Sequence, residues 1–222
     1  MEGKDHMNGS NELEKGYRHF RDVSFKKNKD RFRKLVEEGQ SPKALFIGCS
    51  DSRVMPAMIT GSGPGDLFIV RNIGNFVPPF EPDNDFHSTA AAIEYAVVNL
   101  KVSELIVCGH SDCGAIKALF EEHSSTEDNI HMIKWLQLGK PASDLAIEVL
   151  PQRSLTERRV YAEKVSVIFQ LENLMTYPAV RKAIEKGDLF LHGWYYDMAN
   201  GTIYYYDEEH MEFRLLGEHE KG

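Results

Sequence analysis

Short runs rich in apolar residues alternate along most of the chain with longer segments of helical spacing. Five runs predict strands, because buried parallel strands read as nearly continuous apolar segments; they cover residues 44–48, 66–70, 104–108, 188–197 and 202–206. Three segments predict helices; they cover residues 88–100, with Ser88 as the expected cap, 114–122, and 129–177, with breaks near Pro141 and Pro151. The predicted fold class is α/β, with a mostly parallel central sheet flanked by helices.

The first forty residues have a different pattern. Apolar side chains recur there at roughly helical spacing up to Gly39, which predicts a helical arm over residues 12–39. Residues 1–11 are polar and are predicted to be disordered. Because we find no internal repeat and no linker-like stretch, we predict that residues 1–222 form a single domain with this N-terminal arm.

Basic residues are concentrated in the predicted arm. Residues 21–34 contain seven basic and two acidic side chains, a local charge of +5. The whole chain has 26 basic and 34 acidic residues and a net charge of −8, so the remainder must sum to −13. One interpretation of the basic stretch is a solvated helix face. The other is a helix that docks on the acidic surface of a second subunit.

The composition excludes several classes of protein. The 222 residues are 42% hydrophobic and 27% charged, which is enough apolar content for a core. The net negative charge is unsuited to nonspecific nucleic-acid binding, and no apolar run approaches the roughly eighteen residues of a membrane span. Residues 1–15 contain no apolar stretch, and three cysteines cannot form a closed set of disulfides. We therefore expect a cytoplasmic protein with no nucleic-acid or membrane partner.

Two of the predicted strands end in similar polar motifs. The run ALFIG is followed by Cys49 in C-S-D-S-R, and the run ELIVCG is followed by His110 and Cys113 in H-S-D-C-G. The carboxyl ends of parallel strands meet at one edge of a sheet, where ligands bind in open α/β folds. Two thiolates and an imidazole at that edge are a suitable ligand set for zinc.

The number of candidate ligands distinguishes the kind of zinc site. Structural zinc sites are closed by four protein ligands, whereas catalytic sites keep one position open. Cys108 lies on the strand before the Gly109 turn and is interpreted as a core residue, which leaves three ligands. The alternative is that two buried cysteines and a histidine are unrelated. Asp51 and Arg53 favour a catalytic site, because a carboxylate can accept a hydrogen bond from bound water and a guanidinium can hold that carboxylate with two parallel bonds.

Longer segments around both motifs resemble the β-class carbonic anhydrases. The resemblance spans roughly residues 40–207 and includes PGDLFIVRNIGNFVPP, AAIEYAVVNLKVSELIVCGHSDCGAI and LHGWYYDMANGTIYYYD. It implies reversible hydration of carbon dioxide to bicarbonate and a proton, a Zn²⁺ cofactor whose bound hydroxide is the nucleophile, and a homodimer or tetramer whose pocket draws on both subunits. It also implies that Cys49, His110 and Cys113 hold the zinc. Asp51 and Arg53 match the family's catalytic dyad.

The resemblance further implies a substrate pocket. The residues at the matching positions are Gln40, Phe68, Tyr95 and Gly114. One family subgroup has a tryptophan shortly before the first zinc ligand and binds bicarbonate at a noncatalytic site. Phe46 occupies that position here, which favours the subgroup typified by plant enzymes. In some members the aspartate swings onto the zinc and displaces water, so Asp51 is a conditional metal ligand, in a closed form only.

The ligand set also bears on pH dependence. Two thiolates neutralise the charge of a zinc ion, so water bound to it should have a higher pKa than in a site of three neutral imidazoles. We therefore expect activity to be favoured by alkaline pH, unless Asp51 compensates.

Two alternatives to carbon dioxide hydration stay open. Carbon disulfide and carbonyl sulfide are linear and apolar, so a hydrolase of either could use the same fold and the same zinc hydroxide. A non-catalytic zinc protein that binds bicarbonate or regulates a partner is the other alternative. An intact pair of Asp51 and Arg53 argues against it, because a binding module has no need to activate water.

Overall fold

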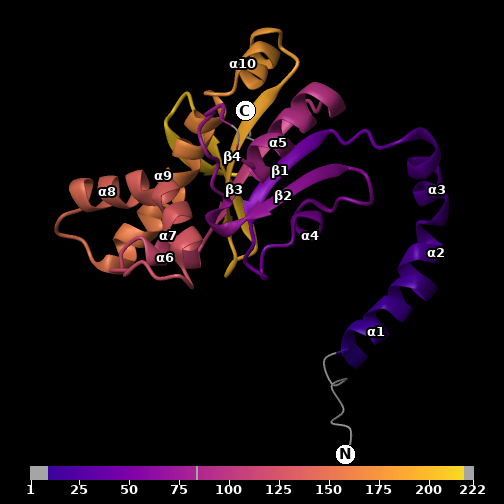
Figure 1. Ribbon diagram of the computed structural model, residues 1–222, viewed down its shortest axis with the longest axis horizontal. Helices are drawn as coiled ribbons and strands as arrows, with labels where there is room; N and C mark the ends of the chain where they lie inside the picture. The colour runs from indigo at the N-terminus through magenta and orange to yellow at the C-terminus, as the bar shows by residue number, and fades with distance from the viewer. Residues whose placement is uncertain (1–9, 84, 218–222) are drawn as a thin grey trace, which may run out of the picture. The chain divides into compact units, whose positions relative to one another are not determined.

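The computed structural model describes residues 10–83 and 85–217 (Figure 1). The chain divides into two compact units, residues 1–40 and 41–222. The disorder predicted for residues 1–11 concerns mainly residues outside the described part. Positions 10 and 11 are described, and they belong to the first helix.

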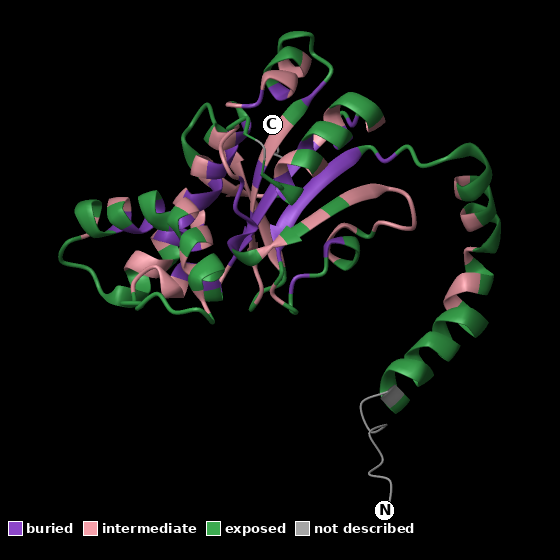
Figure 2. Cartoon of the chain, viewed as in Figure 1, coloured by how far each residue is buried: buried purple, intermediate pink, exposed green. Residues whose placement is uncertain are grey.

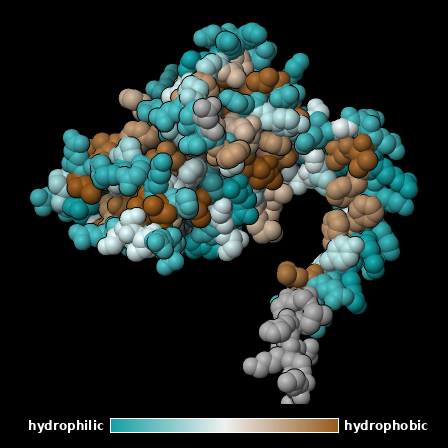
Figure 3. Space-filling model, viewed as in Figure 1, coloured by the Kyte–Doolittle hydropathy of each residue, from teal (hydrophilic) through white to brown (hydrophobic). Residues whose placement is uncertain are grey.

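The N-terminal unit is helical. It comprises α1 (Ser10–His19), a π-helical stretch (Phe20–Ser24), α2 (Phe25–Lys27) and α3 (Lys29–Glu38). None of the side chains that the structure describes in this unit is buried. Within the unit, the rings of Phe20, Phe25 and Phe32 contact one another, with centroids 5.4 to 6.3 Å apart. Figure 3 shows apolar side chains along one side of this unit and hydrophilic ones along the other, the arrangement of an amphipathic helix.

The second unit is built on a mixed sheet, which confirms the predicted fold class. Within the described residues its six strands are β1 (Ala44–Cys49), β2 (Leu67–Asn72), β3 (Glu104–His110), β4 (Phe190–Asp197), β5 (Thr202–Asp207) and β6 (Glu212–Leu215). They lie in the order β2-β1-β3-β4-β5-β6. The first four are parallel and the last two are added antiparallel. Parallel neighbours need long crossovers, which is where most of the helices lie.

The helices of the second unit cover the sheet and its carboxyl edge. They are α4 (Pro56–Thr60), α5 (Ser88–Glu94) with a π-helical extension (Tyr95–Leu100), α6 (Gly114–Ala118), α7 (Ile130–Leu136), α8 (Lys140–Val149), α9 (Leu155–Leu174) and α10 (Pro178–Glu185). Short 3₁₀ turns occupy Ile73–Asn75 and Gln137–Gly139. The longest helix, α9, begins at a capping box in which Ser154 and Glu157 bind each other's backbone N–H.

The two central strands, β1 and β3, are buried almost throughout (Figure 2). Alternate residues point to opposite faces of a strand, so each face has its own cluster. One cluster joins Leu45 and Val107 to Val167 of α9. The other joins Phe46 and Cys108 on the opposite face. Burial of the strands from both faces is the reason that their sequences read as continuous apolar runs.

Some local predictions differ from the structure. Ser88 is the first residue of α5 rather than its cap, and the preceding residue, His87, makes no side-chain cap hydrogen bond. The helices α4 and α10 and the strand β6 were not predicted, because they are short, with five, eight and four residues. The segment 114–122 is helical only to Ala118.

A third cluster of buried side chains lies at the carboxyl edge of the sheet. It contains Cys49, Cys113 and the fully buried ring of Phe76. Gly139, between α7 and α8, packs directly on this ring. A Cβ atom at Gly139 would lie 2.9 Å from Leu119 Cδ1 and closer still to the Phe76 ring. The glycine therefore fixes how closely the α7–α8 segment approaches the two cysteines.

We predict that Gly139→Ala destabilises the protein by about 1–3 kcal/mol, because a buried aromatic ring must shift to make room. Urea unfolding followed by circular dichroism measures the change. The matched control is Gly16→Ala in α1, where a Cβ would meet nothing within 4 Å. That variant should stay within about 1 kcal/mol of the parent, since alanine favours a helix. Equal urea midpoints of unfolding for the two variants would contradict the claim that Gly139 has no room for a Cβ atom.

Candidate metal centre

Cys49 is the last residue of β1, at the carboxyl edge of the sheet. Its side chain is buried, with 5% of the residue exposed. The chain then turns sharply, and the backbone N–H of Asp51 donates to Cys49 Sγ at 3.4 Å. A hydrogen bond to sulfur favours the thiolate, which is the form of cysteine that binds metal ions.

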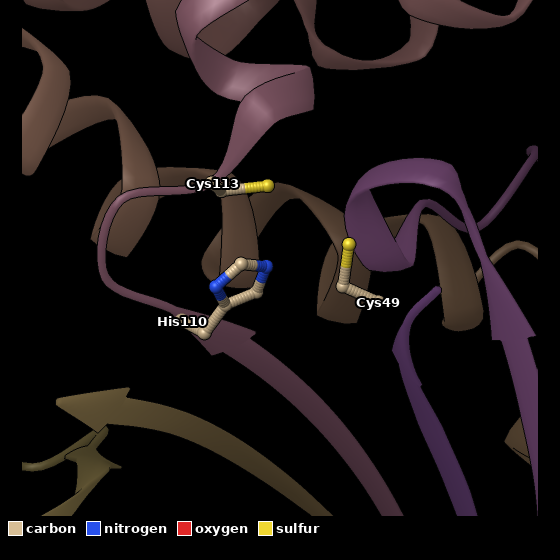
Figure 4. Close-up of side chains that lie close together, drawn as sticks. All are labelled: Cys49, His110 and Cys113. Carbon is tan, nitrogen blue, oxygen red and sulfur yellow. The ribbon is translucent and has the colours of Figure 1, made fainter. Parts of the chain in front are cut away.

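His110 and Cys113 come from the neighbouring strand and helix. His110 ends β3, and Cys113 is the residue before α6 begins at Gly114. Both are buried. One ligand atom of each of Cys49, His110 and Cys113 lies within 4.8 Å of the other two. Figure 4 shows the two sulfur atoms and one ring nitrogen directed toward the same space. The sequence predicted this grouping, because neighbouring parallel strands have their carboxyl ends at the same edge of the sheet.

The hydrogen bonds of His110 define which nitrogen faces that space. Nδ1 lies 2.9 Å from the backbone oxygen of Ser111. Since a carbonyl only accepts, Nδ1 carries the proton and Nε2 keeps a free lone pair. Nε2 is buried and has no hydrogen-bond partner in the described part of the chain. A buried acceptor without a partner is costly, and a metal ion at this point would satisfy it.

The two sulfur atoms influence each other's ionisation. Hydrogen bonding from Cys113 lowers the pKa of Cys49 to about 4, against the opposing effect of burial. The Cys49 thiolate and burial raise the pKa of Cys113 in turn. Without a cation, one proton is therefore shared between the two sulfurs. A divalent ion would displace it and bind both as thiolates, so the residues present fit a zinc ion.

The third cysteine, Cys108, takes no part in this group. Its side chain is fully buried in β3, which continues through Gly109 to His110 without the predicted turn, and burial raises its pKa to about 12. It packs in the cluster that contains Phe46 and Ile106. This agrees with its interpretation as a core residue.

Asp51 and Arg53 form a two-pronged ion pair beside the ligand atoms. Arg53 Nε donates to Asp51 Oδ1 at 2.9 Å, and Arg53 Nη2 donates to Oδ2 at 2.7 Å. The backbone N–H of Arg53 adds a third bond to Oδ1, also of 2.9 Å. These bonds hold the pKa of the Asp51 carboxyl well below its usual range. Among the described residues the group of ligand atoms does not include Asp51.

Two residues that the sequence did not single out make hydrogen bonds to the backbone of the segments that carry the candidate ligands. Arg71 of β2 donates to the backbone oxygen of Cys49 at 3.0 Å and to that of Asp51 at 2.7 Å. Glu163 of α9, 4% exposed, accepts from the N–H of Cys113 at 3.2 Å and from the Tyr195 hydroxyl at 2.8 Å. Burial raises the pKa of Glu163. The only sequence signal for Glu163 was its place among apolar residues of a buried helix face.

An apolar cavity of about 290 Å³ opens beside Cys49 and Asp51. Its other lining residues are Ser50, Ile73, Gly114, Ala115, Ala118, Met132 and Leu136. The predicted substrate residue Gly114 therefore lies at the cavity. The residues that line it come from β1, from the turn after β2, and from α6 and α7.

The other predicted substrate residues lie elsewhere. Phe68 and Tyr95 pack on each other with ring centroids 5.8 Å apart. Phe68 is paired with Leu45, four residues before Cys49 in the strand, which corresponds to about 13 Å along the sheet. Neither ring lines the cavity among the residues that the structure describes. Gln40 is exposed and is the last residue of the N-terminal unit. A role of these three residues in binding substrate stays a prediction.

Comparison with known proteins gives consistent similarities. A family model described as carbonic anhydrase matches residues 44–203. A carbonic anhydrase of Synechocystis is 40% identical over 195 residues, which are 88% of this chain and 70% of the relative. A carbonic anhydrase of Pseudomonas aeruginosa is 37% identical over 209 residues, which are 92% of this chain and 90% of the relative.

Solved structures extend the similarity to the fold. The structure of the β-carbonic anhydrase CcaA superposes with a TM-score of 0.87 at 38% identity, over 93% of this chain and 92% of that one. A structure from a study of two tetrameric β-carbonic anhydrases of the ascomycete Sordaria macrospora superposes with a TM-score of 0.71 at 33% identity, over 94% of both chains.

We predict that Cys49→Ala loses zinc while Cys108→Ala keeps it. Removal of a ligand should weaken zinc binding by more than the 10- to 100-fold that loss of an outer hydrogen-bond partner costs. Elemental analysis after dialysis should find about one zinc per chain in the parent and in Cys108→Ala. Circular dichroism serves to show that both variants are folded. Zinc retained by Cys49→Ala would remove that residue from the site.

Proposed function

This chain belongs to the β-carbonic anhydrase family and is an enzyme of that family, and we propose that it hydrates carbon dioxide reversibly to bicarbonate and a proton with zinc as its metal. The observation that carries the proposal is the buried, unpartnered Nε2 of His110 between the sulfurs of Cys49 and Cys113. These three residues would hold the zinc and leave one coordination position open. When bound, zinc lowers the pKa of a water molecule in that position and so supplies hydroxide as the nucleophile.

Asp51 and Arg53 would act on the water that reacts. Asp51 is one of the residues that line the cavity, and its carboxylate stays ionised at neutral pH because Arg53 binds both of its oxygens. An ionised carboxylate can accept a hydrogen bond from that water and so orient a lone pair toward carbon dioxide. The same ion pair keeps the carboxylate out of the group of ligand atoms, which preserves the open position.

The cavity wall would select for an uncharged substrate. Ile73, Ala118 and Leu136, which line the cavity, have apolar side chains. Carbon dioxide carries no charge and loses little on leaving water for such a wall, whereas bicarbonate, being charged, is disfavoured there. The chain would thereby admit the substrate and favour release of the product into solvent.

We also propose that the active form is a homodimer or a tetramer in which Phe68, Tyr95 and Gln40 complete the pocket of a neighbouring subunit. Their own chain places Phe68 about 13 Å along the sheet from Cys49. The similar Sordaria macrospora proteins are tetrameric. The N-terminal unit has exposed apolar residues, among them Leu13, Tyr17 and Phe20, which a neighbouring subunit could cover.

The proposed setting is the cytoplasm, with carbon dioxide and bicarbonate as the small-molecule partners. Among the residues that the structure describes, no helix combines the length and the apolar character that crossing a membrane requires. A cytoplasmic setting also agrees with three reduced cysteines, since disulfides are rare there.

The proposed reaction is tested by stopped-flow hydration of carbon dioxide with a pH indicator. The parent should show a zinc-dependent rate that is lost on chelation and restored by zinc. Asp51→Ala should keep its zinc but lose about a hundredfold in kcat/KM, the usual scale for a group that positions a reacting proton. Asp144→Ala, which removes an exposed ion pair on α8, is the control and should match the parent. Sulfide release from carbonyl sulfide without carbon dioxide hydration would instead support the hydrolase alternative.

A pocket shared between subunits predicts complementation between inactive variants. Cys49→Ala would lack the metal, and Tyr95→Ala would lack a pocket wall. When both chains are co-expressed, each mixed dimer should contain one complete site, so about a quarter of all sites should regain activity. Cys49→Ala mixed with His110→Ala should stay inactive, because both lesions affect the same half of the site. No recovery in the first mixture, with mixed dimers shown by mass spectrometry, would place Tyr95 outside the partner's pocket.

A further inference from the structure

Arg53 has a second acidic neighbour, Asp112, in the turn that joins His110 to Cys113. Arg53 Nη1 donates to Asp112 Oδ2 at 3.2 Å, and Nη2 donates to the backbone oxygen of Asp112, also at 3.2 Å. Asp112 has a φ of 59°, in the left-handed region that aspartate and asparagine enter more readily than most residues. One turn residue thus offers a carboxylate and a carbonyl oxygen to the guanidinium that binds Asp51.

Asp112 is held in turn by Lys117 of α6. The Lys117 ammonium pairs with Oδ1 of Asp112, the carboxylate oxygen that Arg53 leaves free. Four side chains therefore form a chain of ion pairs that alternate in charge, in the order Asp51, Arg53, Asp112, Lys117. Lys117 is outside the group of ligand atoms and does not line the cavity.

We propose that Asp112 and Lys117 are positioning residues that hold the Arg53 guanidinium on Asp51. Half of the Arg53 side chain is exposed, whereas only 16% of the Asp51 side chain is. Without a contact on its outer side, the long arginine side chain could rotate away and release the carboxylate. Asp112 supplies that contact from the turn between His110 and Cys113. The ion-pair chain therefore joins this turn to the segment that follows Cys49.

The inference rests on the proposed function, because it assigns a support to the proposed pair of catalytic residues. The exposure of the two side chains sets the size of the expected effect on kcat. The Asp112 and Lys117 side chains are 56% and 38% exposed, so solvent screens their interaction and each contact contributes modestly. The effect should therefore fall on kcat rather than on the metal, and it should be smaller than that of removing Asp51.

The first experiment removes the charge furthest from the ligands. Lys117→Met should keep about one zinc per chain and lower kcat by about twofold to fivefold, with KM changed less. Lys117→Arg retains a cation and should restore most of kcat. Lys140→Met, which breaks an exposed pair with Asp144 on α8, is the matched control and should match the parent. Equal kcat for Lys117→Met and the parent would overturn the proposal.

The second experiment asks whether Lys117 acts through Asp112 and Asp51. Asp112→Asn tolerates the left-handed turn but loses the charge that both cations bind. Residues that act as one chain give non-additive effects, so adding Lys117→Met to Asp112→Asn should lower kcat by less than about 1.5-fold further. The same should hold when Lys117→Met is added to Asp51→Ala. If Lys117→Met lowered kcat in either background by as much as it does in the parent, Lys117 would act by another route.

Zinc content and activity of the parent separate the two proposals. A parent without zinc-dependent hydration would overturn the proposed function itself. A parent with normal activity, together with additive effects in the two variant backgrounds, would overturn only the positioning role of Asp112 and Lys117. Loss of zinc from Lys117→Met would likewise count against it, because the proposed chain acts on Asp51 and not on the ligands.

Discussion

A buried imidazole nitrogen without a hydrogen-bond partner, set between two sulfur atoms, is the constraint on which the rest of this structure depends. Burial makes both an orphan acceptor and a second thiolate costly, and a divalent cation relieves both at once. The parallel sheet creates this situation by ending β1 and β3 at one edge, so that Cys49 and His110 meet although sixty positions separate them. The hydrogen bond from Nδ1 to Ser111 fixes the tautomer that the cation requires.

Much of the fold was predictable, because its central strands are buried on both faces and their apolar runs are unambiguous. The ligands were predictable for a related reason, since polar residues directly after such runs lie at the edge where ligands bind. Arg71 and Glu163 were not, because their roles consist of contacts made across 20 to 50 positions of sequence. The pair of Asp51 and Arg53 was predictable, because the two residues are only two positions apart and a single turn brings carboxylate and guanidinium together.

Two kinds of support surround the candidate centre, and they differ in how they resist change. Behind the ligands, Glu163 and the Phe76 ring are buried, so each substitution there disturbs packing or leaves a polar group without a partner. On the other side, the charged side chains of Arg53, Asp112 and Lys117 are each more exposed than that of Asp51, and solvent weakens each pair. The rear of the site is thus rigid through close packing. The ion-pair chain from Asp51 to Lys117 instead depends on several contacts that are each weak.

The N-terminal unit follows a different thermodynamic rule from the sheet. Its first helical stretch runs without a break from Ser10 to Lys27, changing from α to π and back, and none of its described side chains is buried. Because most helical stability in proteins comes from packing of an amphipathic face, the free energy that orders this stretch has to come from contacts outside the unit. If neighbouring chains supply those contacts, ordering of the described residues of this unit is linked to association by mass action. Helix content would then vary with protein concentration, and dilution would unwind the arm before it affects the sheet.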